Sequence, residues 1–254
     1  MFSFEHFSIA PLQLGAMLLA MTLLGGGASP ETWAQGDAHQ NAPSAGSITV
    51  DDFERYDAGE PPDQWVRVNS ETEVRSAEQA IGDGEEFAVV EQDGDQFVRL
   101  YTQGEYIRFS QRTGKEFEWN LNTHPRLAWR WRALELPEGA SEKGTNDTGG
   151  AVYVTFGKDW LGRPRSIKYT YSSSLPVGTV VSFGSLTVIV ANSAVEPHQG
   201  AWQSVQRDVA SDYRQVFGEK PPRRPVSITI SGDSDSTNGV SKVDIDDIRL
   251  LPAQ

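Results

Sequence analysis

Cysteine is absent from the chain, which excludes disulfide bonds, thiolate metal sites and cysteine nucleophiles. Histidine is scarce, and beyond residue 46 only His124 and His198 occur. Neither lies near the G-x-S-x-G turn that marks many serine hydrolases, and two separated histidines do not make a zinc site. Both flank prolines and are interpreted as loop residues, so no catalytic residue is assigned from a motif.

Positive charge is also in short supply. The chain carries 22 Lys and Arg residues against 35 Asp and Glu residues, a net charge of −13. Binding to nucleic acid needs a basic face that neutralises phosphates, so a nucleic-acid partner is not expected. Hydrophobic residues make up 38% of the chain, enough to build the core of one large domain, and a monomer is expected.

A long hydrophobic run occurs only at the N-terminus, from Leu12 to Leu24, ahead of Thr32-Trp33-Ala34. A transmembrane helix takes about 20 apolar residues, so a run of this length before small residues is typical of a secretory signal. We predict a signal peptide over residues 1–34, no membrane span, and a periplasmic or secreted protein. Residues 1–11 lack Lys and Arg, which is atypical of a signal, and an uncleaved anchor is the alternative.

Residues 35–46 are small and polar and are predicted to form a flexible linker before a domain over residues 47–252. Alternating apolar and polar residues then recur in short runs: 48–50, 97–101, 127–133, 151–156, 167–171, 186–190, 226–230 and 243–250. Such runs, separated by turn residues, predict an all-β fold, a two-sheet antiparallel β-sandwich of the jelly-roll kind. One short helix is expected over 209–217, with Gly218 as its C-terminal cap.

The last run has an irregular alternation. Val243 and Ile245 share one parity, whereas Ile248 and Leu250 share the other. A slip of one residue turns every following side chain to the other face unless an extra residue bulges out. We therefore predict a β-bulge at Asp246-Asp247.

Several segments together carry a family likeness: Trp129-Arg-Trp-Arg132, Asn146 to Phe156, Ile167-Lys-Tyr169, Leu175-Pro-Val-Gly178, Gly200-Ala-Trp202, Arg207 to Tyr213 with Phe217-Gly218, and Asp233 to Thr237 ahead of Asp247-Ile248. In this order, over residues 48–251, they resemble the bacterial family called domain of unknown function 3047. The chain departs from that pattern at Ala151, where arginine is usual, and at Asp208, where asparagine is usual. The resemblance implies no activity.

The two ends of the domain also resemble the galactose-binding-like jelly rolls of carbohydrate-binding modules, in which acidic residues near both chain ends hold calcium. Here the acidic residues are Asp51, Asp52, Glu54, Asp246 and Asp247. Carboxylates that lie close together repel one another unless a cation neutralises them, and calcium takes six to eight oxygen ligands. We expect a structural calcium ion held by Asp52, Glu54, Asp246 and Asp247, unless strand alternation turns some of them to solvent.

Other acidic residues are candidates for paired-carboxylate chemistry, as in glycoside hydrolysis or polysaccharide lysis. They are Asp147, Asp208, Asp212, Asp233 and Asp235, and the competing interpretation is that they cap turns and helix ends. Asp233 to Gly239 also spaces oxygen ligands as hard cations favour, but without flanking helices a polar turn is the preferred interpretation.

The predicted sheet faces indicate a ligand surface. Alternation puts Trp129 and Trp131 on a buried side, and Arg130, Arg132, Tyr153 and Lys168 on the outward side. We expect this outward set to form one basic strip that could bind a carboxylate or sulfate group. The competing interpretation is an ordinary solvated face.

The leading function is therefore an exported, non-catalytic binding module for an extracytoplasmic carbohydrate, with acidic carbohydrates among the candidates. One alternative is a hydrolase or lyase that acts on a polysaccharide through Asp or Glu carboxylates. Another is a structural protein of the cell envelope.

Overall fold

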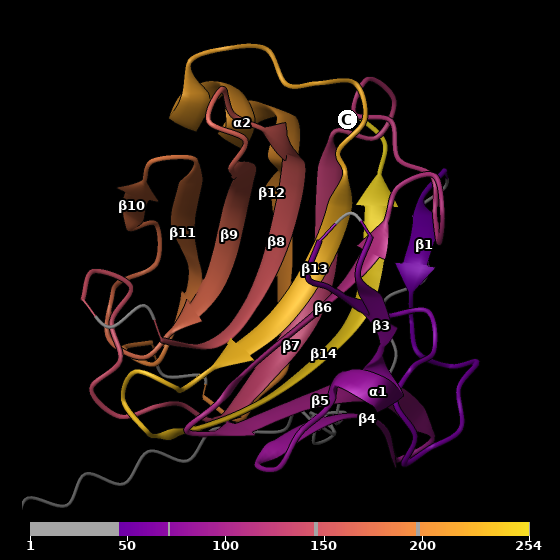
Figure 1. Cartoon of the computed structure of the whole chain (residues 1–254), viewed down its shortest axis with the longest axis vertical. Helices are drawn as coiled ribbons and strands as arrows, with labels where there is room; N and C mark the ends of the chain where they lie inside the picture. The colour runs from indigo at the N-terminus through magenta and orange to yellow at the C-terminus, as the bar shows by residue number, and fades with distance from the viewer. Residues whose placement is uncertain (1–45, 71, 145–146, 197–198, 254) are drawn as a thin grey trace, which may run out of the picture. The chain divides into compact units, whose positions relative to one another are not determined.

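The computed structural model describes residues 46–253, except for residues 71, 145–146 and 197–198. The predicted signal peptide, nearly all of the linker, Asn146 and His198 lie outside the described residues. Within them, the chain forms two β-sheets that pack face to face around one core, as the alternating runs predicted (Figure 1). No helix among the described residues is long and apolar enough to cross a membrane.

The first sheet has six strands in the order β12-β7-β14-β5-β4, with β1 paired to β14. Their bounds are β1 Ile48–Asp51, β4 Glu85–Gln92, β5 Asp95–Gln103, β7 Arg126–Glu135, β12 Gln203–Asp208 and β14 Val240–Leu251. Every pair in this sheet is antiparallel. The first and last strands of the domain are therefore neighbours.

The second sheet has eight strands in the order β10-β11-β9-β8-β13-β6-β2-β3 (Figure 1). Their bounds are β2 Val66–Val68, β3 Val74–Ser76, β6 Tyr106–Arg112, β8 Thr148–Lys158, β9 Pro164–Ser172, β10 Val180–Phe183, β11 Leu186–Ser193 and β13 Ser227–Asp233. The β9 and β11 strands run parallel, a departure from the purely antiparallel expectation, and the other pairs are antiparallel.

The core is built from the inward-facing residues of both sheets. Trp129 and Trp131 of β7 lie against each other edge to face, with ring centroids 5.3 Å apart, and both are almost fully buried. Each also contacts a tyrosine of β9 across the sandwich, Tyr169 and Tyr171, at 5.6 Å. The expectation that the tryptophan pair is buried is confirmed, because large aromatic rings that share one strand face supply much of the apolar area between two sheets.

The predicted bulge is also present. The register of β14 against β7 shifts between Asp246 and Arg249, and Asp247 has a φ of 54°. This extra residue lets Val243, Ile245, Ile248 and Leu250 all reach the core, where each is fully buried.

Among the described residues two helices accompany the sheets, α1 Ala77–Ala80 and α2 Val209–Phe217, one more than the sequence predicted. The α2 helix has the predicted bounds. The Asp208 side chain accepts a hydrogen bond from the Ser211 amide at 2.8 Å, and Gly218 follows with a φ of 72°. The helix packs at one end of the sandwich, where Tyr213 contacts Phe156 of β8 with ring centroids 4.6 Å apart (Figure 1).

Candidate functional site

The structure divides the four predicted ligand residues between two sheets. Arg130 and Arg132 lie on β7 in the six-stranded sheet, whereas Tyr153 and Lys168 lie on β8 and β9 in the eight-stranded sheet. All four alternate with core residues and point away from the core, so the two pairs lie on opposite outer faces. The single strip expected from the sequence is not formed, because alternation shows that a residue faces outward but not which sheet carries it.

Arg130 and Arg132 belong to a closed network of charges. The carboxylate of Asp244, which is fully buried, accepts from Arg132 Nε at 2.8 Å and from Arg99 Nε and Nη2 at 2.7 and 2.9 Å. Arg130 is hydrogen-bonded to Asp246 and to Asp95. Trp202 covers both arginines, with guanidinium carbons 4.7 and 4.8 Å from its ring centroid. These guanidinium groups are therefore already paired within the protein.

The carboxylates at the two chain ends do not converge as expected. β1 does pair with β14, but Asp51 is buried and accepts from Trp65 Nε1 and Gln111 Nε2, both at 2.8 Å. Glu54 accepts from the Gln96 amide at 3.0 Å. No described contact joins Asp52 to these groups.

Arginines neutralise the other two predicted calcium ligands. Asp246 is hydrogen-bonded to Arg130, and Asp247 forms ion pairs with Arg130 and Arg249. Guanidinium groups thus supply the positive charge that the sequence argument assigned to a cation. Calcium binding by Asp52, Glu54, Asp246 and Asp247 stays a prediction, and a rise in melting temperature on adding calcium would be its sign.

Lys168 stands at the centre of the other outer face. It belongs to a row of residues that are aligned across neighbouring strands, in the order Lys168, Tyr153, Thr229 and Ser110. Its Nζ lies 5.3 Å from the Tyr153 ring centroid, although only 4% of the residue is exposed. No hydrogen bond or ion pair joins this ammonium group to any described residue. Three N–H donors are therefore held in place on the face without an acceptor.

Hydroxyl groups without partners lie in the next row of the same face. Thr170, Ala151 and Ser231 are aligned across β9, β8 and β13, and all three are buried. Thr170 Oγ1 and Ser231 Oγ have no hydrogen-bond partner. The family resemblance leads one to expect arginine at position 151. The alanine methyl group that stands there can form no hydrogen bond with either hydroxyl. Buried polar atoms are rarely left unsatisfied, so these two hydroxyls are exceptions to the usual pairing.

Three of the candidate carboxylates converge at the edge of this face. Carboxylate oxygens of Asp147, Asp233 and Asp235 all lie within 4.8 Å of one another. Asp147 is held by the amides of Ser236 and Thr237, at 3.1 and 2.7 Å. Asp233 Oδ1 is buried and has no partner. The other two candidates are structural, since Asp208 caps α2 and Asp212 forms an ion pair with Arg207.

The charge state of Asp233 depends on this setting. Burial raises the pKa of Asp233 from 3.8 to about 6, Lys168 lowers it, and Asp235 and Asp147 raise it further. The folded protein is therefore more stable with Asp233 protonated than with Asp233 ionised. The stability that this group contributes is complete below pH 3.8 and is lost as the pH rises to about 6.

Replacing Asp233 by asparagine should remove this pH dependence, because the amide cannot ionise. We expect Asp233→Asn to melt at the same temperature as the native protein near about pH 4 and at a higher temperature near about pH 7. Thermal unfolding at the two pH values measures the difference, with Asp63→Asn, an exposed site, as the control. A difference that stays constant with pH would contradict the assignment.

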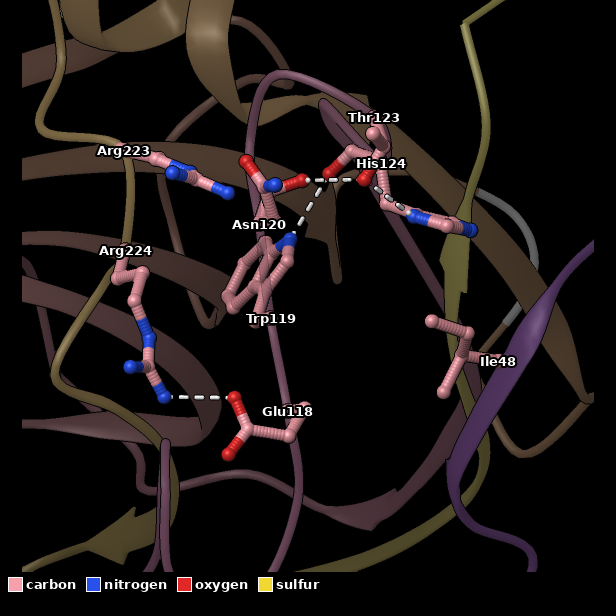
Figure 2. A pocket seen from close by; sticks show the side chains of 8 residues that line it. All are labelled: Ile48, Glu118, Trp119, Asn120, Thr123, His124, Arg223 and Arg224. Atoms are coloured by element: carbon pink, nitrogen blue, oxygen red, sulfur yellow. Dashed lines mark hydrogen bonds and ion pairs between the residues drawn. The ribbon is translucent and has the colours of Figure 1, made fainter.

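A separate pocket of about 360 Å³ lies beside β1, at the end of the sandwich near α2 (Figure 2). Its lining residues are Ile48, Glu118, Trp119, Asn120, Thr123, His124, Arg223 and Arg224. Arg224 is paired with Glu118 at 2.6 Å, and the ring nitrogens of His124 are 3.0 Å from Thr123 Oγ1 and 2.9 Å from the Gly46 carbonyl oxygen. His124 is a loop residue, as predicted, and most polar groups of this pocket are bonded to one another.

The fold and the face around Lys168 define a β-sandwich protein with a polar outer face on one sheet. Residues 73–249 match the family described as "Protein of unknown function (DUF3047)", and the chain belongs to that family. The family identified from the sequence is thereby confirmed. No curated protein matches the chain.

Similar solved structures include two carbohydrate-binding modules from Clostridium thermocellum. The family 11 module of the cellulosomal cellulase Lic26A-Cel5E is 12% identical with a TM-score of 0.40, over 83% of this chain and 97% of that one. The family 30 module of the cellulase CEL9D-CEL44B is 16% identical with a TM-score of 0.41, over 82% and 99%. The xyloglucanase domain of NopAA from Sinorhizobium fredii is 9% identical with a TM-score of 0.35, over 68% and 94%.

Proposed function

We propose that this protein is an exported, non-catalytic module that binds a carbohydrate on the outer face of the eight-stranded sheet. The observation that carries the proposal is the Lys168 ammonium group, which is held beside the Tyr153 ring without a hydrogen-bond acceptor. The buried hydroxyls of Thr170 and Ser231, in the next row of the same face, also lack partners. Export rests on the apolar N-terminal run, and the mature chain is proposed to begin at Gln35.

The chemistry of this face suits a sugar. Each sugar hydroxyl both donates and accepts a hydrogen bond, so it needs donors such as Lys168 and acceptors such as the Asp233 carboxylate. The apolar C–H face of a sugar ring packs on an aromatic ring, and Tyr153 supplies one. Such sites commonly combine aromatic side chains with a few placed polar groups.

The charges on this face favour a neutral carbohydrate over an acidic one. One ammonium group, Lys168, is near three carboxylates, those of Asp147, Asp233 and Asp235. A uronic acid or sulfated sugar would meet repulsion from those carboxylates, whereas hydroxyl groups would not. The arginines that the sequence argument assigned to acidic groups are paired on the opposite face.

A glycan array followed by calorimetry on the best ligand tests the proposal. Lys168→Met keeps the length of the side chain and removes its donors, and we expect it to weaken binding by about 10- to 100-fold, as the loss of a charged hydrogen bond predicts. Lys115→Met, at an exposed site in the turn after β6, is the matched control and should bind as the native protein does. No binding to any glycan, or unchanged binding by Lys168→Met, would reject the proposal and favour a structural role.

A second candidate function, glycoside hydrolysis, rests on the acidic group at the edge of the same face. Asp233 has a pKa raised to about 6 and lies near the exposed Asp235 carboxylate, an arrangement that could pair a general acid with a nucleophile or base. Release of reducing ends from a polysaccharide by the native protein, and its loss in Asp233→Asn, would favour this function. Binding of the polysaccharide without its hydrolysis would favour the non-catalytic binding module.

A further inference from the structure

We propose that the β8–β9 hairpin tip is a membrane-surface contact that inserts Trp160 and Leu161 among the headgroups of an anionic bilayer. Trp160 is 88% exposed and Leu161 is 54% exposed, and Trp160 is the most exposed large apolar residue in the described part of the chain. Tryptophan is enriched at membrane interfaces, because its ring is apolar and its N–H stays near water.

The turn holds these two side chains out rigidly. Asp159 Oδ1 accepts from the amides of Leu161 and Arg163 at 2.9 and 2.8 Å, and Asp159 Oδ2 accepts from Arg163 Nε at 2.8 Å. The Gly162 amide also donates to the Asp159 carbonyl at 2.9 Å. Because four hydrogen bonds already fix this turn, its apolar residues would lose little conformational entropy on binding.

A third exposed apolar residue lies on the neighbouring hairpin. The turn between β10 and β11 lies beside the β8–β9 turn, because Ser166 of β9 donates its amide to the Ser185 carbonyl at 2.9 Å. A β-carbon at Gly184 would stand 3.3 Å from Arg163 Nη1. Phe183, next to this glycine, is 44% exposed. Exposed apolar side chains that gather from adjacent turns typically mark an interaction surface.

The charge around the hairpin is opposite to that of the whole chain. Residues 158–165 together with residues 214–220, which cover the last turn of α2 and the three residues after it, hold five Lys or Arg residues and two Asp or Glu residues. The net charge of the whole chain, by contrast, is −13. The two segments are in contact, since the Arg165 guanidinium lies 5.2 Å from the Phe217 ring centroid. Locally positive charge beside apolar side chains complements anionic lipid headgroups.

The first strand of the domain begins at this same end. His124 Nε2 lies 2.9 Å from the carbonyl oxygen of Gly46, just before β1. The next residue, Pro125, accepts a hydrogen bond at its carbonyl from the Ala210 amide of α2. Arg165 at the hairpin donates to the hydroxyl of Tyr213 on α2 at 3.1 Å. Figure 1 shows β1 starting at the end of the sandwich where α2 lies. Gly46, the first described residue, therefore lies at the same end of the sandwich as the hairpin.

Co-sedimentation of the exported protein with vesicles tests this inference. We expect binding to vesicles of phosphatidylcholine with phosphatidylglycerol, weaker binding to phosphatidylcholine alone, and at least about a tenfold loss in the double variant Trp160→Ala with Leu161→Ala. Val195→Ala, 55% exposed on the loop that follows the far end of β11, is the control and should bind as the native protein does. Both changes are at exposed sites, so the melting temperature should not move.

A second measurement locates the contact. Lipids brominated on their acyl chains should quench the fluorescence of the native protein and not that of the double variant, because the other described tryptophans are buried or half-buried. Absence of vesicle binding, or equal binding by the double variant, would overturn the inference. Loss of polysaccharide binding in the double variant without any vesicle binding would also overturn it and make Trp160 a sugar-stacking residue. The proposed carbohydrate site is tested by Lys168→Met, so the two proposals can fail separately.

Discussion

Replacing Asp51 by alanine should lower the free energy of unfolding by about 3–5 kcal/mol, because it removes the acceptor at the centre of a buried hydrogen-bond network. The Asp51 residue is 2% exposed and lies between the sheets. Its Oδ2 accepts from Trp65 Nε1 at 2.8 Å, Gln111 Nε2 at 2.8 Å and the Tyr56 hydroxyl at 2.7 Å. Without this carboxylate, the indole and amide donors stay buried with no acceptor.

Urea denaturation measures the change, and the adjacent residue supplies a matched control. Asp52 is half-buried and has no described hydrogen bond, so Asp52→Ala should cost less than about 1 kcal/mol. Similar losses for the two variants would show that the Asp51 network does not stabilise the sandwich.

Replacing Asp244 by alanine should cost a similar amount, about 3–5 kcal/mol, on the outer face of the six-stranded sheet. Asp244 is fully buried, and it pairs with Arg99 at 2.7 Å and with Arg132 at 2.8 Å. The side chains of these arginines are only 18% and 13% exposed, so the variant would leave two largely buried cations without their shared counterion. Breaking a buried ion pair by removing one partner is costly for this reason.

A double-mutant cycle separates the charge pairing from a general loss of packing. Arg99→Ala in the Asp244→Ala background should cost less than Arg99→Ala alone, since its partner is already gone. Glu91→Ala, an exposed carboxylate on β4 of the same sheet, is the control and should leave the unfolding midpoint nearly unchanged. Additive effects of Arg99→Ala and Asp244→Ala would contradict the network.

The local elements were predictable from short stretches of sequence. The slip in alternation between Ile245 and Ile248 gave the bulge at Asp247, and the spacing of Val209, Tyr213 and Phe217 before Gly218 gave α2. Both features depend on side-chain periodicity and on backbone preferences within about ten residues, which a single sequence displays directly. The burial of Trp129 and Trp131 followed in the same way.

The candidate site was only half predictable. Lys168 and Tyr153 were placed correctly on an outward face and are register partners on neighbouring strands. Arg130 and Arg132 were grouped with them because the strands share a pattern, yet β7 belongs to the other sheet. The lack of hydrogen-bond partners at the Thr170 and Ser231 hydroxyls was not predicted, since it depends on Ala151 and on the pairing of β8 with β13.

The sequence by itself determined the class of fold, the positions of α2 and the bulge, the family, and which residues of each strand face the core. These follow from periodicity, which is a property of neighbouring residues along the chain. Only the tertiary structure decided that Arg130 and Arg249 pair with Asp246 and Asp247, and that Asp147, Asp233 and Asp235 converge. It also placed the β8–β9 turn at the end of the sandwich where β1 begins. The partner of a charge is set by strand order and register between segments far apart in sequence, and no local pattern records that order.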